Sequence, residues 1–85
     1  MNKYKSRTEI VEAVQIDNEN IEDVTAWCGG SMPAGWSLYP YIEIRIKRGK
    51  YITGSVGEWM IKDENGNFST CKPEEFNARY EAINA

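Results

Sequence analysis

The amino-acid sequence predicts a small α+β domain with a mostly antiparallel sheet of four to six short strands. Three observations favour this class: one segment with strict polar–apolar alternation, one segment with helical spacing, and short turns rich in glycine and asparagine through the second half. The chain has 85 residues, of which 41% are hydrophobic, which is enough for one core. We therefore expect a single domain over residues 1–85.

The first half of the chain predicts a strand followed by a helix. Ile10–Ile16 is rich in β-branched side chains and ends at an Asp-Asn pair, which is typical of a turn. Apolar residues then recur at helical spacing over 19–28, after asparagines that can cap a helix and before Gly29 and Gly30, which can end it. The residues of this apolar stripe are Ile21, Val24, Trp27 and Cys28.

Residues 41–70 predict a meander of four short strands. Tyr41–Lys47 alternates strictly and places its isoleucines, Ile46 included, on one face, as in a half-buried antiparallel strand. Turns follow at 48–50 and 55–57, and the Asn-Gly pair at 65–66 carries the signal of a type I′ hairpin.

The last residues predict a short helix and a final strand. Pro73 suits the first position of a helix, and the two glutamates after it suit the positive end of a helix dipole. We therefore expect a helix near 73–78 that carries Phe76. The alternation over 79–83 permits one more strand.

Charge and hydropathy restrict the class of partner. The net charge of −3 argues against a protein that binds nucleic acid mainly by electrostatics. No run of eighteen apolar residues occurs, and no apolar segment follows the first residues, so we expect neither a membrane span nor a signal peptide. The expected location is the cytoplasm, where cysteines stay reduced.

The residue types offer little for catalysis. Histidine is absent, which removes the commonest general base and the commonest metal ligand. Glu58, Asp63 and Glu64 surround one strand and its turn, where a paired-acid site is the alternative to a solvated edge. We expect no enzyme, no metal and no cofactor.

The two cysteines differ in their expected surroundings. Cys28 lies on the apolar stripe of the first helix, where a thiol packs as a small hydrophobe. Cys71 precedes Lys72 and Pro73 at the start of a helix, a setting that lowers the pKa of a thiol. Reactivity of Cys71 is therefore the alternative to a structural role.

Large apolar residues gather in and after the loop over 29–40. This loop has three glycines and two prolines, and its length is typical of functional loops. The candidate partner-binding residues are Trp36, Leu38, Tyr39 and Tyr41. Such residues are enriched at protein interfaces, but they can equally cover a small core.

A basic and aromatic hairpin is the second candidate surface. Its residues are Arg45, Lys47, Arg48, Lys50 and Tyr51. A surface of this kind can hold phosphates and stack bases. The alternative interpretation is a solvated edge strand whose charges prevent aggregation.

Short motifs that span nearly the whole chain resemble a family. They are Glu12-Ala13-Val14-Gln15, Trp27, Gly57-Glu58-Trp59-Met60-Ile61-Lys62, Gly66-Asn67-Phe68, and Cys71-Lys72-Pro73-Glu74-Glu75-Phe76 with Tyr80. This pattern is similar to that of small proteins encoded by bacteriophages and prophages, sometimes described by a Pro-Gly-Asp-Tyr-Gly-like turn. Glu58 stands where that family usually has Asp, and Val56 where it often has Pro. The resemblance implies a phage or prophage origin and expression inside a bacterium, and it implies no active site.

Together these observations predict a non-catalytic phage accessory protein that binds a host or phage protein. A homodimer is a natural supplement to so small a core. The alternative function is a small-ligand or nucleotide-binding domain that uses the basic hairpin.

Overall fold

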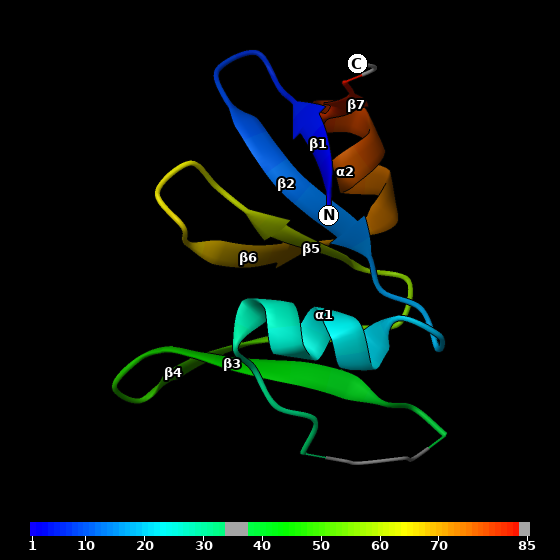
Figure 1. Cartoon of the computed structure of the whole chain (residues 1–85), viewed down its shortest axis with the longest axis vertical. Helices are drawn as coiled ribbons and strands as arrows, with labels where there is room; N and C mark the ends of the chain where they lie inside the picture. The colour runs from blue at the N-terminus through cyan, green and yellow to red at the C-terminus, as the bar shows by residue number, and fades with distance from the viewer. Residues whose placement is uncertain (34–37, 84–85) are drawn as a thin grey trace.

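A computed structural model describes residues 1–33 and 38–83, and the predicted α+β class is confirmed. The described residues form two helices and seven strands, and every strand pair is antiparallel. Five strands form one sheet in the order β6-β5-β2-β1-β7 (Figure 1). Their bounds are β1 Asn2–Lys5, β2 Ile10–Gln15, β5 Trp59–Lys62, β6 Phe68–Cys71 and β7 Glu81–Ala82.

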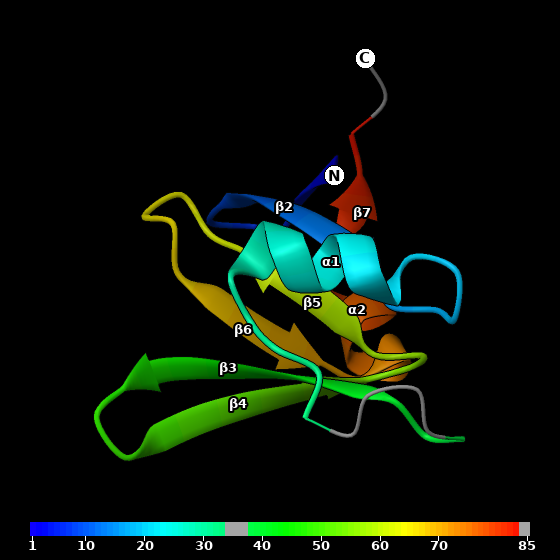
Figure 2. The same cartoon turned by 60° about the horizontal axis from the view of Figure 1, so that its bottom comes forward.

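The remaining two strands form a separate hairpin, β3 Tyr41–Lys47 and β4 Lys50–Ser55. Figure 2 shows this hairpin as a layer of its own below β6. The Thr70 hydroxyl of β6 donates a hydrogen bond of 3.1 Å to the Thr53 carbonyl of β4, so the two layers touch without continuous strand pairing. The predicted four-strand meander is therefore wrong, because β5 pairs with β2 from the other half of the chain.

The two helices cover opposite faces of the five-stranded sheet. α1, Ile21–Cys28, lies between the sheet and the β3–β4 hairpin, and α2, Pro73–Arg79, packs on the other face (Figure 1). Strand β2 shows the alternation that separates them: Val11 and Ala13 face α2, whereas Ile16 at its end faces α1.

Each face has its own core. The aliphatic core lies under α1 and consists of Ile16, Ile21, Val24, Cys28, Ile42, Ile44 and Met60. The aromatic core lies under α2 and groups Tyr4, Trp59, Phe76 and Tyr80 with Val11, Ala13 and Ile61. A chain of this length thus stabilises two layers with two small cores rather than one.

Local signals in the sequence explain the helix ends. The expected helices are confirmed, with α1 two residues shorter at its start and α2 beginning at Pro73 as its first helical residue. Asn20 is the N-cap of α1, and Gly29 ends it in the left-handed conformation.

Two details depart from expectation. The five-stranded sheet lies within the expected four to six strands, but β1 was not predicted: this polar segment with one half-buried tyrosine pairs between β2 and β7. The prediction of a type I′ turn at 65–66 is wrong, because that turn needs a positive φ at both central residues and only Gly66 has one (83°). The Asp63 carboxylate accepts the backbone N–H groups of Asn65 and Asn67, both at 2.9 Å, which holds the turn in a longer form.

Candidate functional site

Two exposed apolar side chains lie where the chain enters β3. Leu38 is 91% exposed and Tyr39 is 85% exposed. The next residue, Pro40, is buried, and Tyr41 is half-buried at the start of β3. Pro40 therefore anchors the segment while Leu38 and Tyr39 extend from it, so these two residues do not cover the core.

A hollow of about 420 Å³ adjoins these side chains. It is lined by Asn18, Leu38, Tyr39, Pro40, Tyr41, Ser55 and Val56. We call Leu38, Tyr39, Tyr41 and Val56 the apolar patch. Val56 was not among the predicted residues because it stands in a turn, although an apolar residue between Ser55 and Gly57 of a predicted turn was a usable signal.

Hydrogen bonds fix the turn that carries Val56. The Gly57 N–H donates to the Ile16 carbonyl at 2.8 Å, and the Gln15 side chain donates to the Gly57 carbonyl at 3.0 Å. The Glu58 carboxylate accepts the Ser55 N–H at 2.8 Å. The turn is thus tied to the end of β2, which gives the apolar patch a rigid side.

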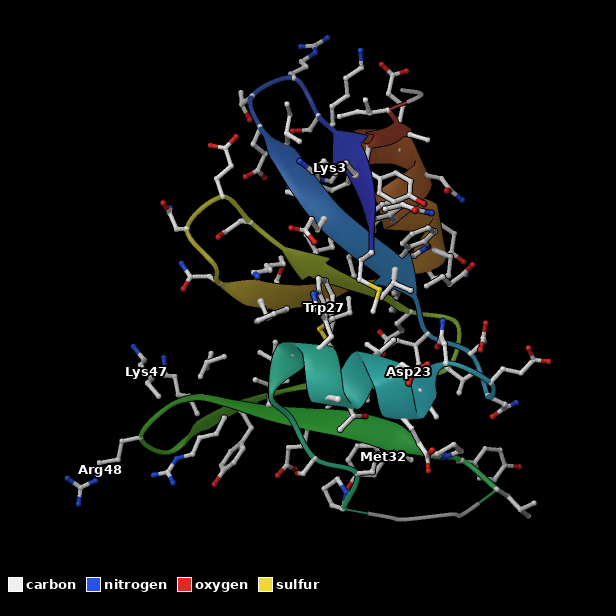
Figure 3. The ribbon with its side chains drawn as sticks, in the orientation of Figure 1. Lys3, Asp23, Trp27, Met32, Lys47 and Arg48 are labelled. Atoms are coloured by element: carbon white, nitrogen blue, oxygen red, sulfur yellow. The ribbon has the colours of Figure 1, made fainter. Side chains whose placement is uncertain are left out.

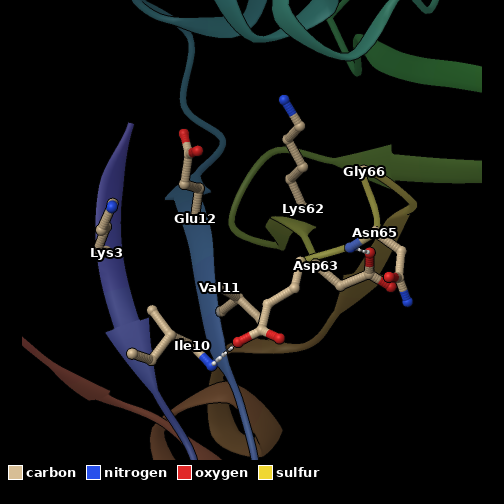
Figure 4. Close-up of a pocket in the computed structure, with 9 residues that line it drawn as sticks. Lys3, Ile10, Val11, Glu12, Lys62, Asp63, Asn65 and Gly66 are labelled. Carbon is tan, nitrogen blue, oxygen red and sulfur yellow. Dashed lines mark hydrogen bonds between the residues drawn. The ribbon is translucent and has the colours of Figure 1, made fainter.

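Each of the three candidate acids accepts a backbone N–H, and Glu58 lies at the other end of β5 from Asp63 and Glu64. Glu58 closes the turn just described, and Asp63 closes the β5–β6 turn. Glu64 accepts the Ile10 N–H at 3.4 Å (Figure 4). These bonds give each carboxylate a local structural role, and the structure does not bring the three together as an acid pair.

Figure 4 shows a hollow between Lys3, Glu12 and Lys62, and its volume is about 630 Å³. Its charged lining residues are Lys3, Glu12, Lys62, Asp63 and Glu64. Because lysines and carboxylates both border it, this hollow favours neither an anion nor a cation.

The basic hairpin end lies at the opposite end of β3–β4 from the apolar patch. We use this name for Arg45, Lys47, Arg48, Lys50 and Tyr51. Arg45 stands opposite Tyr51, and Lys47 stands opposite Lys50 after a shift of register. Tyr41 pairs with Ser55 at the other end, so by the rise of a strand Tyr41 lies about 13 Å from Arg45 and about 20 Å from Lys47.

No carboxylate of the part of the chain that the structure describes forms an ion pair with a cation of the basic hairpin end. Among the described residues the ion pair is Lys5 with Glu81, at 3.4 Å, and it lies on the five-stranded sheet. Tyr51 is 54% exposed beside Arg45. The surface therefore offers positive charge and one aromatic ring to solvent.

Both thiols are free and have raised pKa values. Cys28 is buried in the aliphatic core, as expected, and desolvation raises its pKa. Cys71 is half-buried at the end of β6, where desolvation and then the charge of Glu75 raise its pKa. The expectation of a lowered pKa at Cys71 is wrong, because burial against the sheet outweighs the helix start.

Trp36, the remaining candidate, lies outside the described residues. Within 1–33 and 38–83, no cluster of three or more His, Cys, Asp or Glu side chains is suited to a metal ion. Neither helix there has the length and apolar character needed to cross a bilayer. No protein-family model, no curated protein and no solved structure matches the chain.

Proposed function

We propose that this chain is a phage or prophage accessory protein that binds a host or phage protein through the apolar patch. The observation that carries the proposal is the exposure of Leu38 and Tyr39 beside a hollow walled by Tyr41 and Val56. Grouped apolar side chains on a surface mark contact sites, and tyrosine is enriched at their energetic centres. The phage origin rests on the motif resemblance described above.

The proposed function is non-catalytic and belongs to the bacterial cytoplasm. Two features support a binding role over chemistry. The carboxylates of Glu58, Asp63 and Glu64 accept backbone N–H groups at separate places. The raised pKa values of Cys28 and Cys71 keep both thiols protonated near neutral pH.

Affinity capture from a bacterial lysate tests the proposal, with Tyr39→Ser as the disrupting variant. Tyr51→Ser is the matched control, because it removes an exposed tyrosine from the other end of the same hairpin. We expect one protein to be enriched by the native chain and by Tyr51→Ser and to be lost with Tyr39→Ser. Equal capture by all three chains would contradict the proposal.

A second copy of the chain is the other occupant that the proposal allows. Light scattering of the purified protein distinguishes it from a foreign partner. A homodimer at micromolar concentration that Leu38→Ser turns into a monomer would place the self-contact at the apolar patch, whereas a monomer under all conditions leaves the patch to a different protein.

The basic hairpin end favours a second candidate function, the binding of a nucleotide or another small anion. The specific observation is that Arg45 stands opposite Tyr51 in the hairpin and forms no ion pair within residues 1–33 and 38–83. Thermal unfolding with a panel of nucleotides tests it, since a ligand at about 100 times its dissociation constant stabilises the folded state by about 2.7 kcal/mol. An unchanged unfolding temperature across the panel would exclude this function.

A further inference from the structure

A third hollow opens between the ends of the β3–β4 and β5–β6 hairpins, beside the C-terminal end of α1. Its volume is about 470 Å³. We call it the hairpin groove, and it is lined by Cys28, Ile44, Arg45, Ile46, Lys47, Gly66, Asn67 and Phe68. Cys28 and Ile44 belong to the aliphatic core, so the groove is the place where that core opens to solvent.

The floor of the hairpin groove is apolar and only partly covered. Ile46 was expected on the buried face of its strand, but it is 50% exposed because the register shifts between Arg45 and Lys47. Phe68 is half-buried, and its ring meets Trp27 edge-to-face at 5.1 Å, which fixes it in place. The floor therefore offers a preformed apolar contact to an incoming side chain.

The rim of the groove is positively charged. Lys47 rises on the side of β6, whereas Arg48 extends away from the body of the molecule (Figure 3). Residues 45–50 hold four of the ten basic residues and no acidic one, so the rest of the chain has six basic against thirteen acidic residues. The positive charge of the chain is thus concentrated beside this groove, and Arg45 and Lys47 line it.

We propose that the hairpin groove binds an acidic segment of a partner protein and takes up one bulky apolar side chain from it. The cations are spaced along a strand and its turn, which suits a row of carboxylates better than a single anionic head group. The groove lies at the surface between the ends of two hairpins, so a segment can lie across it. A nucleic acid is disfavoured because the acidic remainder of the chain repels a long polyanion.

This site is distinct from the apolar patch, so the proposal does not rest on the function proposed for that patch. It shares Arg45 and Lys47 with the basic hairpin end and assigns them an acidic protein segment instead of a small anion. The β3–β4 hairpin would then bind partners at both ends, through the apolar patch at its base and through the hairpin groove at its tip. The two ends share no lining residue.

Amide chemical shifts of the full chain test the proposal with a synthetic peptide in which Leu and Phe are flanked by Asp and Glu. We expect this peptide to move the signals of residues 44–47 and 66–68. A peptide with Lys at every acidic position should bind at least about tenfold more weakly, as should one with Ser in place of Leu and Phe. Added salt should lower the affinity for the acidic peptide, because it screens the charges of the rim.

Charge reversal at the rim localises the effect. Lys47→Glu should lower the affinity for the acidic peptide by about tenfold. Lys72→Glu, the same charge change outside the groove, should leave this affinity nearly unchanged. Equal binding of the acidic and the basic peptide would overturn the proposal. Tighter binding of an oligothymidylate, shifts confined to residues 38–41 and 55–56, or a native affinity in Lys47→Glu would overturn it as well.

Discussion

The two faces of the five-stranded sheet are packed in different ways. On the α1 face, the buried side chains are mostly aliphatic and come from four segments: the residue after β2, α1, β3 and β5. On the α2 face, the Phe76 ring stacks on Trp59 with centroids 3.8 Å apart and also contacts Tyr4 and Tyr80. The Trp59 indole N–H is buried with no partner among the described residues, so the indole is held by ring packing rather than by a hydrogen bond of its own. Stability is thus distributed on one face and concentrated in one side chain on the other.

Phe76→Ala should have the largest effect on stability, because it removes the side chain that joins the aromatic core. We expect it to lower the free energy of unfolding by about 3–5 kcal/mol, a large part of the total for a small domain. Ile42→Ala on the α1 face should cost less, because its neighbours can close part of the cavity. Urea unfolding followed by circular dichroism measures both, and Phe76→Leu is the control that keeps apolar volume. An equal loss in Phe76→Ala and Ile42→Ala would show that the two faces are equivalent.

Gly30→Ala should loosen the junction between α1 and the hairpin. A Cβ at position 30 would lie 2.7 Å from the Glu43 carbonyl oxygen, a backbone atom that cannot rotate away. We expect a loss of about 1–3 kcal/mol in the free energy of unfolding and weaker protection of the Ser31 and Glu43 amides from hydrogen exchange. Gly54→Ala is the matched control, since its Cβ would meet the movable end of Ile16 at 2.9 Å. A larger loss in Gly54→Ala would contradict the assignment of Gly30 as the tighter contact.

The sequence predicted most elements because their signals are local. The alternation of β3, the apolar stripe and Gly29 end of α1, and Pro73 at the start of α2 each act within a few residues. The separation of β3–β4 from β5–β6 could not be predicted this way, because it depends on the pairing of β5 with β2 across the chain. Strand β1 also depends on distant neighbours and carries almost no apolar pattern of its own.

The candidate sites were predictable in composition and not in geometry. The apolar and basic residues of the hairpin stand out in the sequence, but their separation to opposite ends follows from strand register. Val56 lies in a turn and Phe68 on β6, and both line these surfaces beside residues of β3. The spacing of residues along the sequence does not predict that these segments lie close together. The raised pKa of Cys71 likewise follows from burial beside the aromatic core, which sequence distance does not measure.

Alkaline pH should lower the stability of the protein through titrating groups on both faces of the sheet. Burial raises the pKa of Cys28 on the α1 face and of Cys71 and Tyr80 on the α2 face above their usual values of 9.0 and 10.0. The unfolded chain releases these protons first, so this part of the stability is full below about pH 9 and is lost as the pH rises through the folded-state pKa values. The Cys71→Ala, Tyr80→Phe double variant removes two of these groups, whereas Cys28→Ala removes one. We therefore expect the free energy of unfolding to fall less at alkaline pH in the double variant than in Cys28→Ala. Urea unfolding at a series of pH values measures it, and equal losses in both variants would contradict the assignment.

Leu38→Ser should have the smallest effect on stability, because Leu38 belongs to neither core. A side chain that is 91% exposed loses almost no buried area on substitution, so we expect the free energy of unfolding to stay within about 0.5 kcal/mol of the native value. Urea unfolding checks this, with Ile44→Ser as the contrast, since the same polar change at a buried position of β3 should be strongly destabilising. A substantial loss in Leu38→Ser would mean that Leu38 packs against the body of the molecule, and the apolar patch would then be part of the fold rather than a surface for a partner.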